Sequence, residues 1–69
     1  MNRLRDLRED NNLTQEQCAK IAYISKKSYE RYENGQNVLP TDVLIKFCKY
    51  YNVSADYVLG LINEFRKLY

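Results

Sequence analysis

Histidine is absent from the sequence, and cysteine occurs only twice, as Cys18 and Cys48. A zinc site draws about four ligands mainly from these two residue types, so the chain offers too few of them. An enzyme would need a nucleophile beside a matching base, and the carboxylates are scattered singly among basic residues. We therefore expect no metal site, no cofactor and no catalytic residue. Both cysteines fall on apolar helical positions, which favours buried thiols over a disulfide.

Long apolar runs are also absent. No segment approaches the roughly 20 apolar residues that a membrane-spanning helix needs, and the N-terminus lacks the pattern of a signal peptide. The sequence contains no low-complexity run, internal repeat or flexible linker, and 69 residues suit a single domain. These absences, together with the expected free thiols, predict a soluble cytoplasmic protein.

The residues that are abundant indicate a small domain with a well-filled core. Hydrophobic residues make up 45% of the chain and include seven tyrosines, whose rings can be buried while their hydroxyls reach water. The net charge of +2 is only weak evidence for a polyanionic partner. The distribution of charge is more informative, because Lys26, Lys27 and Arg31 fall within one short segment.

The rest of the chain is organised around residues 14–35, which contain two helix starts close together. Thr14 followed by Gln17 has the pattern of a capping box, and Ser25 is a second N-cap residue. Asn34-Gly35 is a strong stop signal, because both residues tolerate the left-handed conformation. Only Tyr23-Ile24 separates the two helices. So short a connection makes them cross steeply, which is helix-turn-helix geometry.

Several motifs in this order resemble the DNA-binding domain of the Cro and lambda-repressor (XRE) family. The residues that carry the resemblance are Leu13–Glu16, Ala19, Ile24–Ser25, Tyr32–Gly35, Asn52–Ser54 and Asp56–Tyr57. The resemblance covers roughly residues 3–60. It implies an all-α, compact five-helix domain whose third helix reads the major groove of double-stranded DNA.

Capping residues and apolar spacing predict where the helices lie. We expect a DNA-binding domain over residues 1–60, followed by a C-terminal helical extension over residues 61–69. Tyr23 stands where the family usually has glycine, so a positive φ at this position would be strained. The expected helices span residues 1–11, 14–22, 25–34 and 40–51, with a fifth beginning at residue 54.

The resemblance also implies a set of DNA-contacting residues, on the helices and in the turn that follows the second motif helix. Arg31 is the best candidate for a base contact, since arginine suits guanine O6 and N7, and one of the two lysines is expected to contact phosphate. Backbone N–H groups of residues 34–36 are candidates for a phosphate contact, or the segment is a simple helix stop. Arg8 and Glu33 match an ion pair that ties the first helix to the third. The full DNA-binding set is Gln15, Ser25, Lys26, Lys27, Ser28, Arg31, Asn34 and Gln36.

An apolar stripe marks the tail beyond residue 60, at spacings of one, three and four residues. Two outcomes are equally expected: the stripe forms a two-fold dimer contact, or it folds back over the first helix. The candidates for dimerisation are Tyr57, Leu61, Ile62, Phe65 and Leu68.

These patterns favour a sequence-specific DNA-binding transcriptional regulator of the repressor type. Its expected partners are paired DNA half-sites and a second copy of the chain, with no membrane and no small-molecule ligand. The alternative is an antitoxin or another protein-interaction module that retains the helix-turn-helix fold, which would require an exposed apolar patch.

Overall fold

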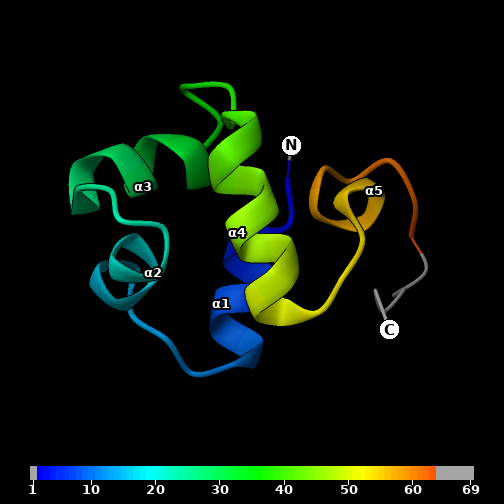
Figure 1. The fold of residues 1–69 in the computed structure, drawn as a ribbon, viewed down its shortest axis with the longest axis horizontal. Helices are drawn as coiled ribbons and strands as arrows, with labels where there is room; N and C mark the ends of the chain where they lie inside the picture. The colour runs from blue at the N-terminus through cyan, green and yellow to red at the C-terminus, as the bar shows by residue number, and fades with distance from the viewer. Residues whose placement is uncertain (1, 64–69) are drawn as a thin grey trace.

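The computed structural model describes residues 2–63, in which the chain forms five α-helices and no strand (Figure 1). This confirms the all-α fold that the sequence predicts. The helices are α1 (Leu4–Asp10), α2 (Gln15–Ile21), α3 (Lys26–Glu33), α4 (Thr41–Tyr51) and α5 (Ala55–Val58).

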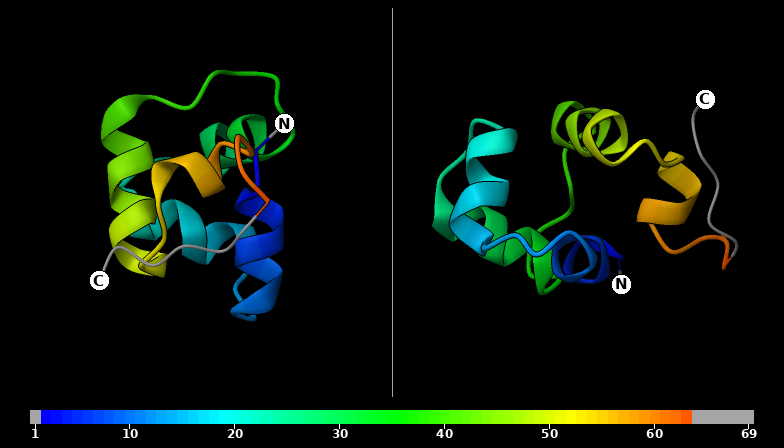
Figure 2. Two further views of the ribbon diagram at one scale, coloured as in Figure 1. Left: turned by 90° about the vertical axis from the view of Figure 1, so that its right-hand side faces the viewer. Right: turned by 90° about the horizontal axis from the view of Figure 1, so that it is seen from below.

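The two central helices are α1 and α4, with α2 and α3 on one side and α5 on the other (Figures 1 and 2). Each helix contributes apolar side chains to one core. Tyr29 of α3 packs edge-on against Phe47 of α4, with ring centroids 5.8 Å apart. Tyr51 reaches α2, where its hydroxyl lies 3.4 Å from the Cys18 thiol. The buried residues of the core are Leu4, Leu7, Cys18, Ala19, Ala22, Tyr29, Val43, Phe47, Cys48, Val53 and Val58.

Side-chain caps define the start of three helices, as predicted. The Thr14 hydroxyl accepts the Gln17 N–H at 3.1 Å, and the Gln17 side chain accepts the Thr14 N–H at 2.8 Å, which completes the capping box. Ser25 and Ser54 each accept the N–H three residues ahead. The start of α3 is therefore set by local hydrogen bonds, which fixes where its surface residues point.

Three helices end in the same hydrogen-bonded turn around a residue of positive φ. At Asn12, Tyr23 and Gly60, the positive-φ residue donates its N–H to the carbonyl three residues back. The next residue donates to the carbonyl five residues back, at 2.9 to 3.0 Å. This pair of bonds defines the Schellman motif, which normally favours glycine at the left-handed position.

Tyr23 has a φ of +57° and is 86% exposed, so the strain foreseen for a tyrosine in this turn is present. Lys46 of α4 supports the turn in two ways. Its ammonium lies 5.3 Å from the centre of the Tyr23 ring, and it donates a 3.3 Å hydrogen bond to the Ala22 carbonyl. The lysine therefore contacts the ring of the strained residue, which stays mostly exposed, and satisfies a carbonyl at the end of α2.

The first residues of the predicted C-terminal helical extension do not continue the fifth helix. Helix α5 ends at Val58, because Gly60, with a φ of +78°, turns the chain. Leu61, one of the dimerisation candidates, lies beyond this helix and is 70% exposed. Residues 61–63 are not helical, and the remainder of the predicted extension lies outside the described residues.

Candidate nucleic-acid interface

The outer surface of α3 carries the cationic side chains of the predicted reading set. Lys26, Lys27 and Arg31 are all exposed, while Tyr29 and Glu33 of the same helix are buried. Lys26 makes an ion pair of 3.8 Å with Glu30, one turn further along the helix. Because both side chains are exposed to solvent, this ion pair is weak, and Lys26 can bind another anion instead. Helix α3 therefore presents three cations to solvent and its apolar side to the core.

Ser25 and Ser28 also lie at the start of α3, where their hydroxyls hydrogen-bond to each other at 3.0 Å. The Ser25 oxygen additionally accepts the Ser28 N–H. These two residues are thus engaged in capping the helix, and Ser28 is half-buried.

Glu33, at the end of α3, is the centre of a polar cluster that we call the Glu33 cluster: Glu33, Arg8, Arg5 and Gln15. Only 1% of the Glu33 side chain is exposed. Arg8 donates two hydrogen bonds to its carboxylate, of 2.9 Å from Nε and 3.1 Å from Nη2. The Arg5 Nε lies 3.5 Å from the same carboxylate. The structure therefore brings the predicted ion pair together and joins α1 to α3 through it.

The environment of Glu33 favours its ionised form. Burial alone would raise the pKa of this carboxyl, but contacts from Arg8, the Tyr29 hydroxyl and Gln15 outweigh burial and lower the pKa. The hydrogen bond to Glu33 in turn raises the pKa of Arg8. Burial and the nearby carboxylate raise the pKa of Tyr29, whose hydroxyl makes no hydrogen bond of standard geometry among the described residues.

Gln15 has a contact that the sequence did not reveal. Its side-chain Nε2 donates to the Glu33 carboxylate at 3.3 Å, which links the first turn of α2 to the end of α3. No spacing rule pairs residues 18 positions apart, so only the folded structure identifies this contact.

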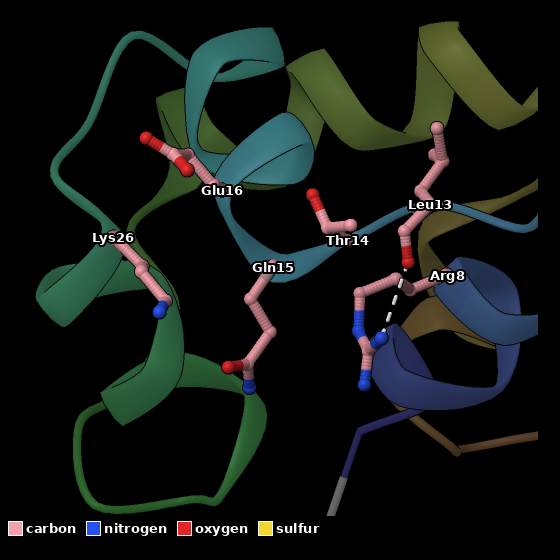
Figure 3. Close-up of a pocket in the computed structure, with 6 residues that line it drawn as sticks. All are labelled: Arg8, Leu13, Thr14, Gln15, Glu16 and Lys26. Carbon is pink, nitrogen blue, oxygen red and sulfur yellow. Dashed lines mark hydrogen bonds between the residues drawn. The ribbon is translucent and has the colours of Figure 1, made fainter.

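A cleft of about 580 Å³, which we call the first cleft, opens between the N-terminal ends of α2 and α3 (Figure 3). The nitrogen-bearing ends of Arg8, Gln15 and Lys26 lie along one side of it, and Arg8 also donates a 3.2 Å hydrogen bond to the Leu13 carbonyl. Two cations and the Glu16 carboxylate share this opening, and the Arg8 and Gln15 donors already bind Glu33 and the Leu13 carbonyl. Its lining residues are Arg8, Leu13, Thr14, Gln15, Glu16 and Lys26.

Comparisons with known proteins agree with this geometry. A family described as a helix-turn-helix domain matches residues 1–64. The chain belongs to this family. The match confirms the resemblance to XRE-type proteins drawn from the sequence.

Curated relatives of this helix-turn-helix domain include two proteins named as transcriptional regulators and one named as an antitoxin. The uncharacterized HTH-type transcriptional regulator YobD of Bacillus subtilis is 44% identical over 62 residues, which cover 90% of this chain and 55% of YobD. Antitoxin PezA of Streptococcus pneumoniae is 37% identical over 57 residues, or 83% of this chain and 36% of PezA. The HTH-type transcriptional regulator ImmR of Bacillus subtilis is 36% identical over 58 residues, or 84% of this chain and 46% of ImmR.

The helix-turn-helix domain thus spans about half the length of YobD and less than half of the other two relatives. No solved structure gives a significant match. Among the described residues, no helix is long and apolar enough to cross a membrane.

The turn after α3 uses its backbone N–H groups internally. The Asn34 N–H donates to Glu30, the Gly35 N–H donates to Tyr32, and the Gln36 N–H donates to the Asn34 side-chain oxygen at 3.1 Å. The helix-stop interpretation of this segment is therefore the one that the structure supports. A DNA contact here has to use the exposed side chains of Asn34 and Gln36 instead.

The dimerisation candidates lie in different surroundings. Tyr57 is half-buried, and the Arg3 guanidinium lies 4.8 Å from the centre of its ring. Ile62 is half-buried, with its carbonyl accepting a 3.1 Å hydrogen bond from the same arginine, while Leu61 is exposed. Phe65 and Leu68 lie outside the described residues. Up to Asn63, the tail is therefore held against the start of α1.

Proposed function

We propose that this chain is a sequence-specific DNA-binding transcriptional regulator, a repressor that acts in the cytoplasm and reads the major groove with α3. The main support is the division of α3 into two faces. Tyr29 and Glu33 anchor one face in the core, and the cations Lys26, Lys27 and Arg31 occupy the exposed one. A recognition helix needs this arrangement, because its position must be rigid while its polar side chains stay free to meet the bases.

Each residue of the reading set has a distinct proposed role. Arg31 donates to guanine O6 and N7, and Lys26 or Lys27 neutralises a phosphate. Ser25 and Ser28, whose hydroxyls are already paired, contribute short contacts at the helix start. Gln15, Asn34 and Gln36 contact the DNA backbone through their side-chain amides, with the Gln15 amide oriented by its bond to Glu33.

The chain is further proposed to bind paired half-sites as a homodimer. Two recognition helices about 34 Å apart would meet successive turns of the same groove face. The proposed dimer contact is formed by the exposed Leu61 and by Tyr57, Ile62, Phe65 and Leu68.

The test of DNA reading begins with selection of tightly bound sequences from a random duplex pool. Replacing Arg31 by alanine should then cost about 1–3 kcal/mol of binding to the selected site and relax the preference at one base pair. Lys49→Ala on α4 is the matched control, since it removes one exposed positive charge from another helix. Full affinity after alanine replacement of Lys26, Lys27 and Arg31 together would overturn the proposal.

Sedimentation equilibrium of the full chain and of a chain ending at Gly60 tests the dimer. We expect the full chain to dimerise and the shortened chain to remain monomeric. Equal dimerisation of the two would show that the tail is not the interface. A full chain that stays monomeric until DNA is added would instead place assembly on the operator.

A second candidate function is that of an antitoxin or protein-binding module. The similarity to PezA and the exposed apolar side chains of Tyr23, Ile45 and Tyr50 favour it. A gel shift tests one form of this candidate, because a module that binds only protein would not retard any duplex from the random pool.

A further inference from the structure

A second cleft, of about 370 Å³, opens on the surface beside Glu33. It is formed where α1 meets the end of α3, and the Glu33 cluster separates it from the first cleft. Of the residues proposed to contact DNA, Asn34 alone lines this second cleft. The second cleft is lined by Asn2, Arg5, Asp6, Glu33 and Asn34.

Arg5 supplies the cleft with unused hydrogen-bond donors. Its side chain is 65% exposed, and its one ion pair among the described residues is the 3.5 Å approach of Nε to Glu33. That carboxylate already accepts two shorter bonds from Arg8, so Arg5 is not needed to neutralise it. The outer N–H groups of the Arg5 guanidinium therefore face solvent, in the planar arrangement that suits a phosphate.

Asn34 adds a second donor to the lining of the cleft. Its side-chain oxygen accepts the Gln36 N–H at 3.1 Å, which fixes the orientation of the amide. The remaining amide group, Nδ2, is a donor that makes no hydrogen bond within residues 2–63. Arg5 of α1 and Asn34, the residue that follows α3, thus both line one opening with hydrogen-bond donors.

The two clefts form a continuous polar row across the proposed interface. Lys26 and Gln15 line the first cleft, Gln15 contacts Glu33, and Glu33 contacts Arg5 in the second. We infer that the second cleft binds a backbone phosphate of the DNA through Arg5 and Asn34. This inference rests on the proposed function, and it extends the interface from the helix-turn-helix onto α1.

Two carboxylates, Asp6 and Glu33, line the cleft and oppose an anion, but Glu33 is paired with Arg8, which leaves Asp6 as the main repulsive group. Substitutions of Asp6 and of Arg5 should therefore change DNA binding in opposite directions. Replacing Asp6 by asparagine should strengthen DNA binding, whereas replacing Arg5 by glutamine should weaken it. A purely structural role for these exposed side chains would not produce opposite signs.

The experiment measures binding of the full chain to a fluorescent random-sequence duplex over a series of salt concentrations. Arg5→Gln should lower the slope of log K against log salt by about 0.9, the value for one lost phosphate contact, and weaken binding several-fold at fixed salt. Lys49→Gln, which removes the same charge from an exposed site on α4, should leave both quantities close to those of the unaltered chain. Thermal melting should show all variants folded.

The outcomes separate this inference from the proposed function. Salt-dependent binding by the unaltered chain with the same slope for Arg5→Gln would overturn the phosphate subsite alone. An equal loss of slope in Lys49→Gln would also overturn it, since the effect would then reflect net charge. Absence of duplex binding by the unaltered chain would overturn the proposed function, and the subsite with it.

Discussion

Helices α2 and α5 end with the same pair of backbone hydrogen bonds but place very different residues at the left-handed position. At the end of α5 the residue is Gly60, with a φ of +78°, which adopts this conformation without steric cost. At the end of α2 it is Tyr23, whose Cβ makes a φ of +57° unfavourable. The same turn is therefore relaxed at one end of the molecule and strained at the other.

The surroundings of the two turns explain how the strain is maintained. A residue in an unfavourable conformation persists only where the structure around it fixes the backbone on both sides. After Tyr23, helix α3 is tied by Glu33 to α1 and to the start of α2, and Lys46 supports the turn itself. After Gly60, the described tail is held mainly by hydrogen bonds from Arg3. The strained turn thus lies in the more strongly connected half of the molecule.

The largest expected effect comes from removing the carboxylate that connects this half. Glu33→Ala leaves the Arg8 guanidinium partly buried without its partner, so it should lower the free energy of unfolding by about 3 kcal/mol. Urea unfolding measures this change. Glu33→Gln is the control, because it keeps the size of the side chain and an acceptor oxygen. A double-mutant cycle with Arg8→Ala that shows no coupling would contradict the assignment.

Acid should reproduce part of this effect without any substitution. Because the pKa of Glu33 is lowered by folding, its ionised form adds stability above the unfolded-state pKa of about 4.3. That contribution is lost as the pH falls through the lower folded-state pKa. Unfolding free energies measured below about pH 4.3 should therefore decline more steeply for the unaltered chain than for Glu33→Gln. Parallel declines would show that Glu33 does not contribute.

The starts of α2, α3 and α5 were predictable, because caps depend on neighbouring residues. Thr14 with Gln17, Ser25 and Ser54 all cap as their sequence positions indicate. Apolar helical spacing likewise predicted that Cys18 and Cys48 are buried, and both are. Local hydrogen bonds and helical periodicity operate over a few residues, so the sequence displays them directly.

Contacts between distant residues were predictable only in part. Arg8 and Glu33 were paired through family resemblance, whereas the bond from Gln15 to Glu33 depends on how α2 crosses α3. In the tail, a predicted helix is absent from the residues that the structure describes. Its apolar spacing predicted a helical extension over residues 61–69, but the left-handed turn at Gly60 ends α5, and residues 61–63 are not helical.

An intermediate effect is expected when the relaxed turn is made to resemble the strained one. Gly60→Ala introduces a Cβ at positive φ and should lower the free energy of unfolding by about 1–2 kcal/mol. Gly60→Asn should cost less, since asparagine tolerates this conformation. Thermal unfolding monitored by circular dichroism compares the two. Equal stability of the alanine variant and the unaltered chain would show that the α5 turn is free to rearrange.

The smallest effect is expected from relieving the strained turn, and two substitutions at Tyr23 separate the contributions. Tyr23→Ala keeps the strain but removes the ring that the Lys46 ammonium contacts, so it should lower the free energy of unfolding by about 0.5 kcal/mol. Tyr23→Gly loses the same contact but also relieves the strain, which should make it about 1 kcal/mol more stable than the alanine variant. Part of this gain is offset because glycine gives the unfolded chain more freedom. Denaturant unfolding of the two variants measures the difference, and equal stabilities would show that the positive φ at this turn carries no cost.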